Sequence, residues 1–189
     1  PESVVTVEPK YLLSNRSFWY PQNPIGDYAT ASLRLTVPSD YRVVASGEPV
    51  ADTSAAPQAE PNGPGTQTFA FRANQPIRYL AFVASRMTKA GERRVEMKDL
   101  TTGAGAESMV LAIEANPRLQ TRGRNLLQPG EDILRFYASL VGDAPYVSAS
   151  VAMTESELPR GHSPAYFALL NGPPQVGIST WRNDPAPFD

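Results

Sequence analysis

The chain has 189 residues, with 17 basic and 19 acidic side chains, a net charge of −2, one histidine and no cysteine. This balance argues against a nucleic-acid partner, because neutralising phosphates requires a clustered basic excess. The absence of cysteine excludes disulfides and cysteine-ligated metals, and the single histidine, His162, cannot supply a zinc site of two or three imidazoles. No apolar run reaches the ~18 residues of a membrane-spanning helix.

Proline, at 19 residues, is about twice as frequent as usual. Because proline fixes φ and lacks an N–H, this density favours short strands and turns over long helices. With 41% apolar residues, the chain has the composition of a globular protein with a hydrophobic core. The composition therefore predicts a β-rich fold.

The amino-terminal half is a series of short apolar segments separated by turn residues. Strict alternation at residues 31–37 predicts a strand with one wet face, and a turn at Pro38 leads into a second strand, so we expect a hairpin. Residues 78–85 are apolar on both sides, which predicts a central strand covered on both faces. Residues 52–65 lack large apolar side chains and are predicted to be a solvated loop. The strands predicted in this half span residues 3–7, 11–13, 31–37, 41–46, 67–72 and 78–85.

A break at residues 87–91 sets the predicted boundary between two units, residues 1–89 and residues 90–189. The second unit mixes strands with a helix, which predicts an α+β organisation. Alternation of Val147 and Val151 with serines predicts another one-faced strand. The strands predicted in this unit span residues 93–98, 108–114, 146–153 and 176–180, the first two joined by the glycine-rich residues 101–105.

One convincing helix is predicted after Pro129-Gly130. Glu131 and Asp132 would lie in its first turn, where carboxylates interact favourably with the helix dipole. Gly142 is expected to end it. An apolar stripe recurs at i, i+3, i+4 and i+7. The stripe comprises Ile133, Phe136, Tyr137 and Leu140.

Several of these segments, in this order, resemble the aminopeptidase N (membrane alanyl aminopeptidase-like) family of zinc metallopeptidases over roughly residues 15 to 170. They are Ser17-Phe-Trp-Tyr-Pro21, Leu33-Arg-Leu-Thr-Val-Pro38, Arg78-Tyr-Leu-Ala-Phe-Val-Ala84, Ile133-Leu-Arg-Phe-Tyr137 and Pro145-Tyr146. The resemblance implies a β-rich α+β fold. A β-sandwich or saddle-like amino-terminal domain would be followed by the first strands and helix of a thermolysin-like catalytic domain.

Members of that family bind zinc through a His-Glu-x-x-His helix and a later glutamate, and this chain contains no such helix. The resemblance therefore implies a non-catalytic amino-terminal fragment, inactive by itself, of a parent protein that binds zinc and hydrolyses peptides. Its partners would be the remainder of the parent catalytic domain and the peptide substrate. Such a fragment would expose apolar surface, so we also expect self-association. An extracytoplasmic or cell-envelope location is the favoured expectation.

The family aligns peptide substrates with a Gly-x-Met-Glu-Asn edge strand, which should follow Glu155. Here Gly161 matches the leading glycine, but Met-Glu-Asn does not follow it. The resemblance makes four residues substrate-cleft candidates: Glu155, Gly161, His162 and Tyr166.

Each candidate also has a plainer interpretation. His162 would be an exposed or capping histidine, because a lone imidazole lacks a partner for metal or nucleophilic chemistry. Glu155 and Glu157 would form a solvated strand end. For the whole chain, the alternative is a stand-alone extracytoplasmic β-rich module that binds carbohydrate or protein. Its binding platform would include the aromatic run Phe18-Trp-Tyr20.

Overall fold

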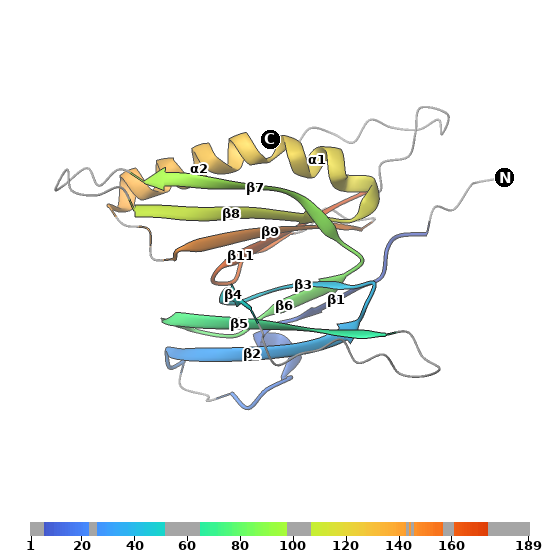
Figure 1. Cartoon of the computed structure of the whole chain (residues 1–189). Coiled ribbons are helices and arrows are strands. Elements are labelled where there is room, and N and C mark those ends of the chain that lie inside the picture. Colours follow the sequence, from blue (N-terminus) through green and yellow to red (C-terminus); the bar gives the residue numbers. More distant parts are fainter. Residues whose placement is uncertain are drawn as a thin grey trace.

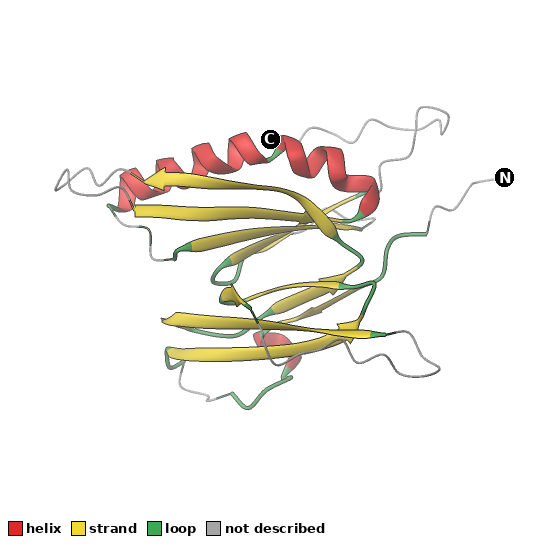
Figure 2. Ribbon diagram, viewed as in Figure 1, coloured by secondary structure: helices red, strands yellow, loops and turns green. Residues whose placement is uncertain are grey.

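The described part of the chain stacks three β-sheets and a layer of helices in the computed structural model (Figures 1 and 2). The structure describes residues 6–22, 26–51, 65–97, 107–142, 144, 146–156 and 161–173. In the first sheet, β5 (Thr66–Ile77) pairs antiparallel with β2 (Ala29–Pro38) and β4 (Glu48–Val50). In the second, β6 (Phe82–Ser85) pairs antiparallel with β1 (Lys10–Leu13) and β3 (Arg42–Ala45). A short 3₁₀ helix, η1 (Asn15–Ser17), follows β1.

The second sheet is the middle layer, and it is buried on both faces. Val43 and Phe82 pack toward the first sheet, in a cluster that includes Leu33 and Phe71. Val44 and Val83, their neighbours in sequence, belong to the opposite cluster, which reaches the third sheet. Successive side chains of a strand point to opposite faces. The prediction of a central strand covered on both faces is therefore confirmed for β6, although the strand begins only at Phe82.

The predicted hairpin of residues 31–37 and 41–46 is wrong. Both segments are strands, but β2 pairs with β5, whereas β3 pairs with β6 in the neighbouring sheet. The turn expected at Pro38 is present, and the Pro38 carbonyl accepts a hydrogen bond from the Tyr41 N–H at 2.9 Å. After this turn the chain crosses into the middle layer. The reason is that β3 carries apolar side chains on both faces, and in the middle layer both faces are buried against a neighbouring sheet.

The third sheet has five strands in the order β10-β11-β9-β8-β7 among the described residues. These are β7 (Thr88–Met97), β8 (Glu107–Ala115), β9 (Ser148–Glu155), β10 (Gly161–His162) and β11 (Phe167–Gly172). The pairs β7/β8 and β10/β11 are antiparallel, whereas β8/β9 and β9/β11 are parallel. The sheet is therefore mixed, and its three inner strands run in one direction.

Two details of the third sheet differ from the sequence-based expectations. The strand at 146–153 is not one-faced, because its second half, from Ala152 to Glu155, is buried on both faces inside the sheet. The break expected at 87–91 lies within β7, where the pairing register shifts between Lys89 and Gly91. The boundary between units at residues 89 and 90 stays a prediction.

Helices cover one face of the third sheet (Figure 1). They are η2 (Pro117–Leu119), α1 (Gln120–Asn125) and α2 (Leu127–Val141). Gly123 lies in α1 at a close approach to the sheet, where an added Cβ would meet the Ala90 Cβ at 2.8 Å. As predicted, Gly142 ends α2, with a φ of 79°. None of the described helices is long and apolar enough to cross a membrane.

The expected position of Glu131 and Asp132 in the first turn of α2 is wrong. The helix begins at Leu127, so Glu131 and Asp132 lie beyond its first turn. Its predicted apolar stripe faces outward, and the members of the stripe are 55–68% exposed. Instead Leu134 and Ala138 pack on the sheet.

Other predicted segments lie outside the described residues. These are residues 3–5, nearly all of the loop at 52–65, the linker at 101–105, Glu157 and the strand at 176–180.

Candidate functional site

The short strand β10 forms one edge of the third sheet. Gly161 and His162 pair with Leu170 and Leu169 of β11, and no other strand of the described part pairs with β10. An unpaired strand edge presents backbone N–H and C=O groups, and an extended peptide can add to it as a further strand. Two of the four candidates therefore share an edge suited to binding a peptide.

The imidazole of His162, on this edge, has a buried nitrogen atom. Its Nε2 atom is buried and has no hydrogen-bond partner in the described structure. The imidazole lies beside Tyr79, with ring centroids 6.2 Å apart and an interplanar angle of 38°. Buried polar atoms are normally hydrogen-bonded, so an unsatisfied nitrogen indicates a place for a ligand atom or a water. The interpretation of His162 as a freely exposed side chain does not fit this burial.

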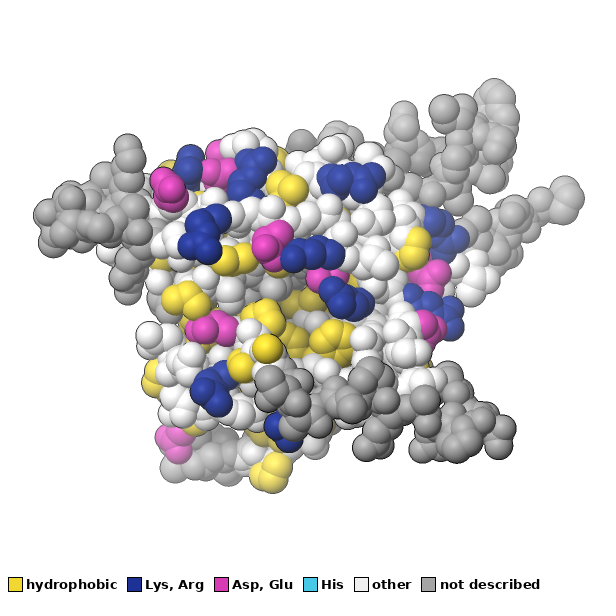
Figure 3. Space-filling model, in the orientation of Figure 1, with side chains coloured by type: hydrophobic (Ala, Val, Ile, Leu, Met, Phe, Trp, Pro, Cys, Tyr) yellow, Lys and Arg dark blue, Asp and Glu magenta, His cyan; other side chains and the backbone are white. Residues whose placement is uncertain are grey.

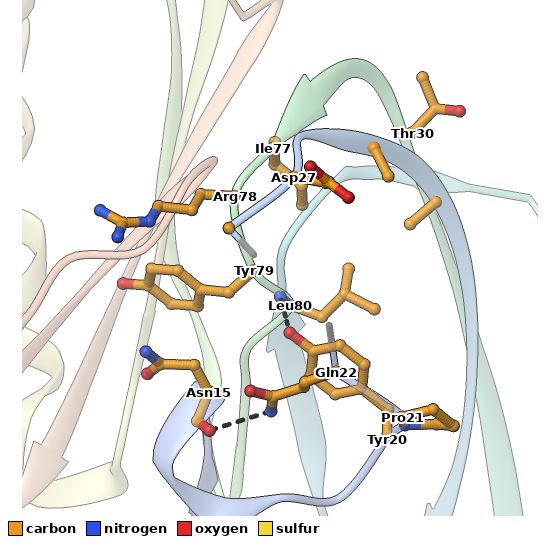
Figure 4. A pocket seen from close by; sticks show the side chains of 13 residues that line it. Asn15, Tyr20, Pro21, Gln22, Asp27, Thr30, Ile77, Arg78, Tyr79 and Leu80 are labelled. Atoms are coloured by element: carbon orange, nitrogen blue, oxygen red, sulfur yellow. Dashed lines mark hydrogen bonds between the residues drawn. The ribbon is translucent and has the colours of Figure 1, made fainter. Parts of the chain in front are cut away.

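A pocket of about 400 Å³ adjoins Tyr79 (Figure 4). Its wall includes Arg78, Tyr79 and Asn15, whose side chains extend in the same direction in Figure 4. The Tyr20 hydroxyl accepts a hydrogen bond from the Leu80 N–H at 3.0 Å, and this bond holds one side of the pocket in place. The aromatic run 18–20 thus contributes to the pocket through Tyr20, whereas Trp19 packs in the core.

Arg78 is the cation of this pocket. It has no ion-pair partner among the residues that the structure describes. A guanidinium has five donors and binds carboxylates and carbonyl oxygens. The pocket and the β10 edge together offer backbone groups, an unsatisfied imidazole and a cation, a combination suited to a peptide.

Glu155 lies elsewhere, at the end of β9. Its side chain is fully buried and accepts hydrogen bonds from Arg118, from Nε at 2.8 Å and from Nη2. The Glu8 backbone N–H donates to the same carboxylate at 3.0 Å, and Arg118 also donates to the Thr6 carbonyl at 2.7 Å. The interpretation as a solvated strand end is wrong, because this carboxylate anchors the amino-terminal segment to the third sheet.

Asn116 completes this buried polar cluster. Its amide nitrogen donates to the Ser85 hydroxyl at 2.9 Å and to the Arg86 carbonyl at 2.7 Å. Its amide oxygen accepts from the Glu155 N–H at 2.9 Å. One side chain therefore joins β6 of the middle sheet to β9 of the third. Sequence reasoning missed this residue, because a lone asparagine before a proline reads as a turn.

Tyr166 lies at the opposite end of β11 from the Glu155 cluster. It is 3% exposed, and its ring is 4.1 Å from that of Tyr146. The Gln75 N–H donates to its hydroxyl at 3.3 Å, and its φ is 73°. A positive φ is costly for a tyrosine, so the surrounding packing holds this residue in place. Burial raises the pKa of the neighbouring Tyr146, further aided by Tyr166.

A second carboxylate, the half-buried Glu114 of β8, links the layers. Its Oε1 atom lies 3.5 Å from Nη2 of Arg42 in β3, and its Oε2 atom is buried without a hydrogen bond in the described structure. Desolvation by burial raises the pKa of Glu114, and the attraction of Arg42 only partly opposes this. Glu114 therefore forms an ion pair between the layers that does not fully compensate its desolvation, and no sequence pattern indicated it.

The structure thus brings Gly161 and His162 together and leaves Glu155 and Tyr166 apart from them. Among the described residues, no group of three or more histidine, aspartate or glutamate side chains could hold a metal ion. These residues therefore do not fit a zinc site.

On the face seen in Figure 3, basic and acidic side chains are interspersed. No extended patch of one sign stands out on that face.

Comparison with solved structures reveals the same fold in zinc metallopeptidases. The M1 zinc metallopeptidase from Deinococcus radiodurans matches 83% of this chain, with a TM-score of 0.59 and 18% identity. A mutant two-domain M1 zinc metallopeptidase bound to L-arginine matches 77% of it, with a TM-score of 0.55 and 19% identity. No family model matches, and no curated protein matches the sequence.

The match is to a part of these enzymes. This chain covers 33% and 31% of the two structures, so it spans about a third of their length. At this identity the likeness establishes a shared β-rich fold. It does not favour the alternative of a stand-alone binding module.

Proposed function

We propose that this chain forms the amino-terminal part of a zinc metallopeptidase of the M1 type. Its β10 edge and the adjoining pocket would then line the peptide-binding cleft. The observation that carries the proposal is the fold shared with M1 zinc metallopeptidases over 77–83% of the chain.

The metal of such an enzyme has to be bound by residues outside this chain. The single histidine and the lack of cysteine leave too few ligands here. The contribution of this chain is to bind and orient the peptide. The β10 edge offers backbone hydrogen bonds, and Arg78 offers a positive charge. His162 offers a nitrogen that has no partner within the described part of the chain.

Gly161 marks where the resemblance to aminopeptidase N ends. Because Met-Glu-Asn does not follow it, the acidic group that binds a free amino terminus has no counterpart in residues 162–165. Arg78, which has no ion-pair partner among the described residues, instead favours a carbonyl or carboxylate of the peptide. We therefore propose that the parent enzyme lacks strict specificity for a free amino terminus.

The experiment is to replace His162 with alanine in the longer polypeptide and to measure kcat and KM for peptide hydrolysis. Losing one hydrogen bond to substrate corresponds to a rise in KM of roughly two- to tenfold. A matched control is Lys89→Ala on the surface of β7, where the exposed Lys89 forms an ion pair with Glu92. If His162→Ala changes KM no more than Lys89→Ala does, β10 is not part of the cleft.

A further inference from the structure

The pocket beside Tyr79 has hydrogen-bond donors gathered on one wall (Figure 4). Arg78 contributes its guanidinium, Tyr79 its hydroxyl and Asn15 its side-chain amide, and the three side chains extend in the same direction. Within the described part of the chain, no hydrogen bond or ion pair occupies any of these three polar groups. Such a wall is suited to a ligand that accepts several hydrogen bonds at once.

The fold holds this wall in place from several segments. Ile77, the last residue of β5, is buried in the core, and the next side chain, Arg78, is exposed on the other side. Gly26 lies against the Arg78 guanidinium, because a Cβ added to this glycine would be 3.5 Å from Nε. The Gln22 side chain donates a hydrogen bond to the Asn15 carbonyl at 2.9 Å, which fixes the backbone that carries the Asn15 amide.

Arg78 and Asp27 are the charged side chains among the described residues of this pocket. They form no ion pair with each other: the two side chains extend to opposite sides in Figure 4, and Asp27 has an interaction of its own. A phosphate group carries almost two negative charges and is typically bound by a cluster of cations. A single guanidinium instead matches one carboxylate, both in charge and in its planar pair of oxygens.

The pocket lies next to the edge of β10. The ring centroids of Tyr79 and His162 are 6.2 Å apart, and an extended peptide advances about 3.3 Å per residue. A peptide that pairs with β10 therefore passes within about two residues of the pocket. A side chain or a chain end at that point can reach the donors of the wall.

We propose that Arg78, together with Asn15 and Tyr79, binds a carboxylate of the peptide, an inference that rests on the proposed function. The carboxylate belongs either to an acidic side chain or to the carboxyl terminus of a short peptide, because both present the same two oxygens. A carboxylate accepts about four hydrogen bonds, about twice as many as a peptide carbonyl, so it uses this set of donors more fully. Because Arg78 is exposed to solvent, the expected gain in affinity is about three- to tenfold.

The first test measures KM and kcat of the longer polypeptide with two kinds of matched peptides. In one kind, glutamate replaces glutamine at each position in turn, and in the other, a free carboxyl terminus replaces an amide. The unaltered polypeptide should prefer the carboxylate member of at least one pair by about three- to tenfold, through KM. The pair that shows the preference identifies the source of the carboxylate.

Three variants separate the guanidinium from a general effect of charge. Arg78→Met should abolish the preference, and Arg78→Lys should keep only part of it, because lysine retains the charge without the planar fork. Arg72→Met is the matched control, since Arg72 is exposed on β5 outside the pocket, and it should leave the preference unchanged. The proposal is overturned if neither pair shows a preference, or if Arg78→Met acts no more strongly than Arg72→Met.

The second test uses the 189-residue chain and needs no hydrolysis. The probes are acetyl-Ala-Ala-Glu-Ala-Ala-amide, its glutamine counterpart, and the glutamine peptide with a free carboxyl terminus. In an NMR titration, the Nε–H resonance of Arg78 should shift with at least one carboxylate probe and not with the amidated glutamine peptide. A shift without hydrolysis by the longer polypeptide would refute the proposed function alone. Hydrolysis without any shift or preference would refute the carboxylate site alone.

Discussion

Arg118→Met tests the buried contact that holds the amino-terminal segment on the third sheet. The Glu155 carboxylate is fully buried, and Arg118 supplies two of its hydrogen bonds. Removing one partner of a buried ion pair costs about 3–5 kcal/mol, because the remaining charge stays buried without compensation. The Arg118 side chain is 33% exposed, so water partly screens the pair. We therefore expect a loss near the lower end, about 3 kcal/mol.

The assay is urea unfolding followed by circular dichroism. With an m-value of about 2–3 kcal/mol per molar urea, this loss corresponds to a fall in the midpoint of about 1–1.5 M. The control is Arg124→Met in α1, where Arg124 is exposed and donates to the Thr121 hydroxyl at 3.3 Å. The double variant, with Arg118→Met and Glu155→Gln together, should lose less free energy of unfolding than the sum of the two single variants. The difference, which is the coupling energy, should be about 1–3 kcal/mol. A loss for Arg118→Met no larger than that of Arg124→Met would refute this reasoning.

Three further predictions follow from other contacts. Glu114→Gln should raise the free energy of unfolding at pH 7, because burial raises the pKa of Glu114 in the folded state. The gain should fade as the pH drops below the pKa of this side chain in the unfolded state. Thermal melts at a series of pH values check this prediction. Gly123→Val should destabilise the chain by about 1–3 kcal/mol through overpacking against Ala90, whereas a matched change at the exposed Thr121 should cost far less in the same urea assay. Val83→Ala, at a fully buried position of the middle sheet, should cost about 1–3 kcal/mol by urea unfolding, and a neutral result would contradict the burial on both faces.

Local patterns predicted the strands well and their pairing poorly. Alternation at residues 31–37 identified β2, and the apolar run at 78–85 identified a strand covered on both faces. The hairpin prediction failed because a short turn such as the one at Pro38 also allows a crossing between sheets. Whether the next strand returns or crosses depends on its second face, and Val44 gives that face an apolar side chain.

The helix shows a different limit of sequence reasoning. A stripe at i, i+3, i+4 and i+7 indicates an apolar face, but it does not indicate what covers that face. In α2, Leu134 and Ala138 pack on the sheet, and the apolar stripe is left exposed.

The candidate site was only partly predictable. The position of Gly161 and His162 after β9 followed from the order of the segments, and the structure places both on an edge strand. The unsatisfied nitrogen of His162 depends on its contact with Tyr79, which is distant in sequence. The burial of Glu155 likewise depends on Arg118, which is distant in sequence, so the sequence alone placed Glu155 in solvent.

The most direct test of the central proposal is the rate of peptide hydrolysis, with and without added zinc, for the 189-residue chain and for the longer polypeptide. The proposal predicts zinc-dependent hydrolysis by the longer polypeptide and none by the 189-residue chain, whose described residues hold no group able to bind a metal. Zinc-dependent turnover by the 189 residues alone, or none by the longer polypeptide, would contradict it.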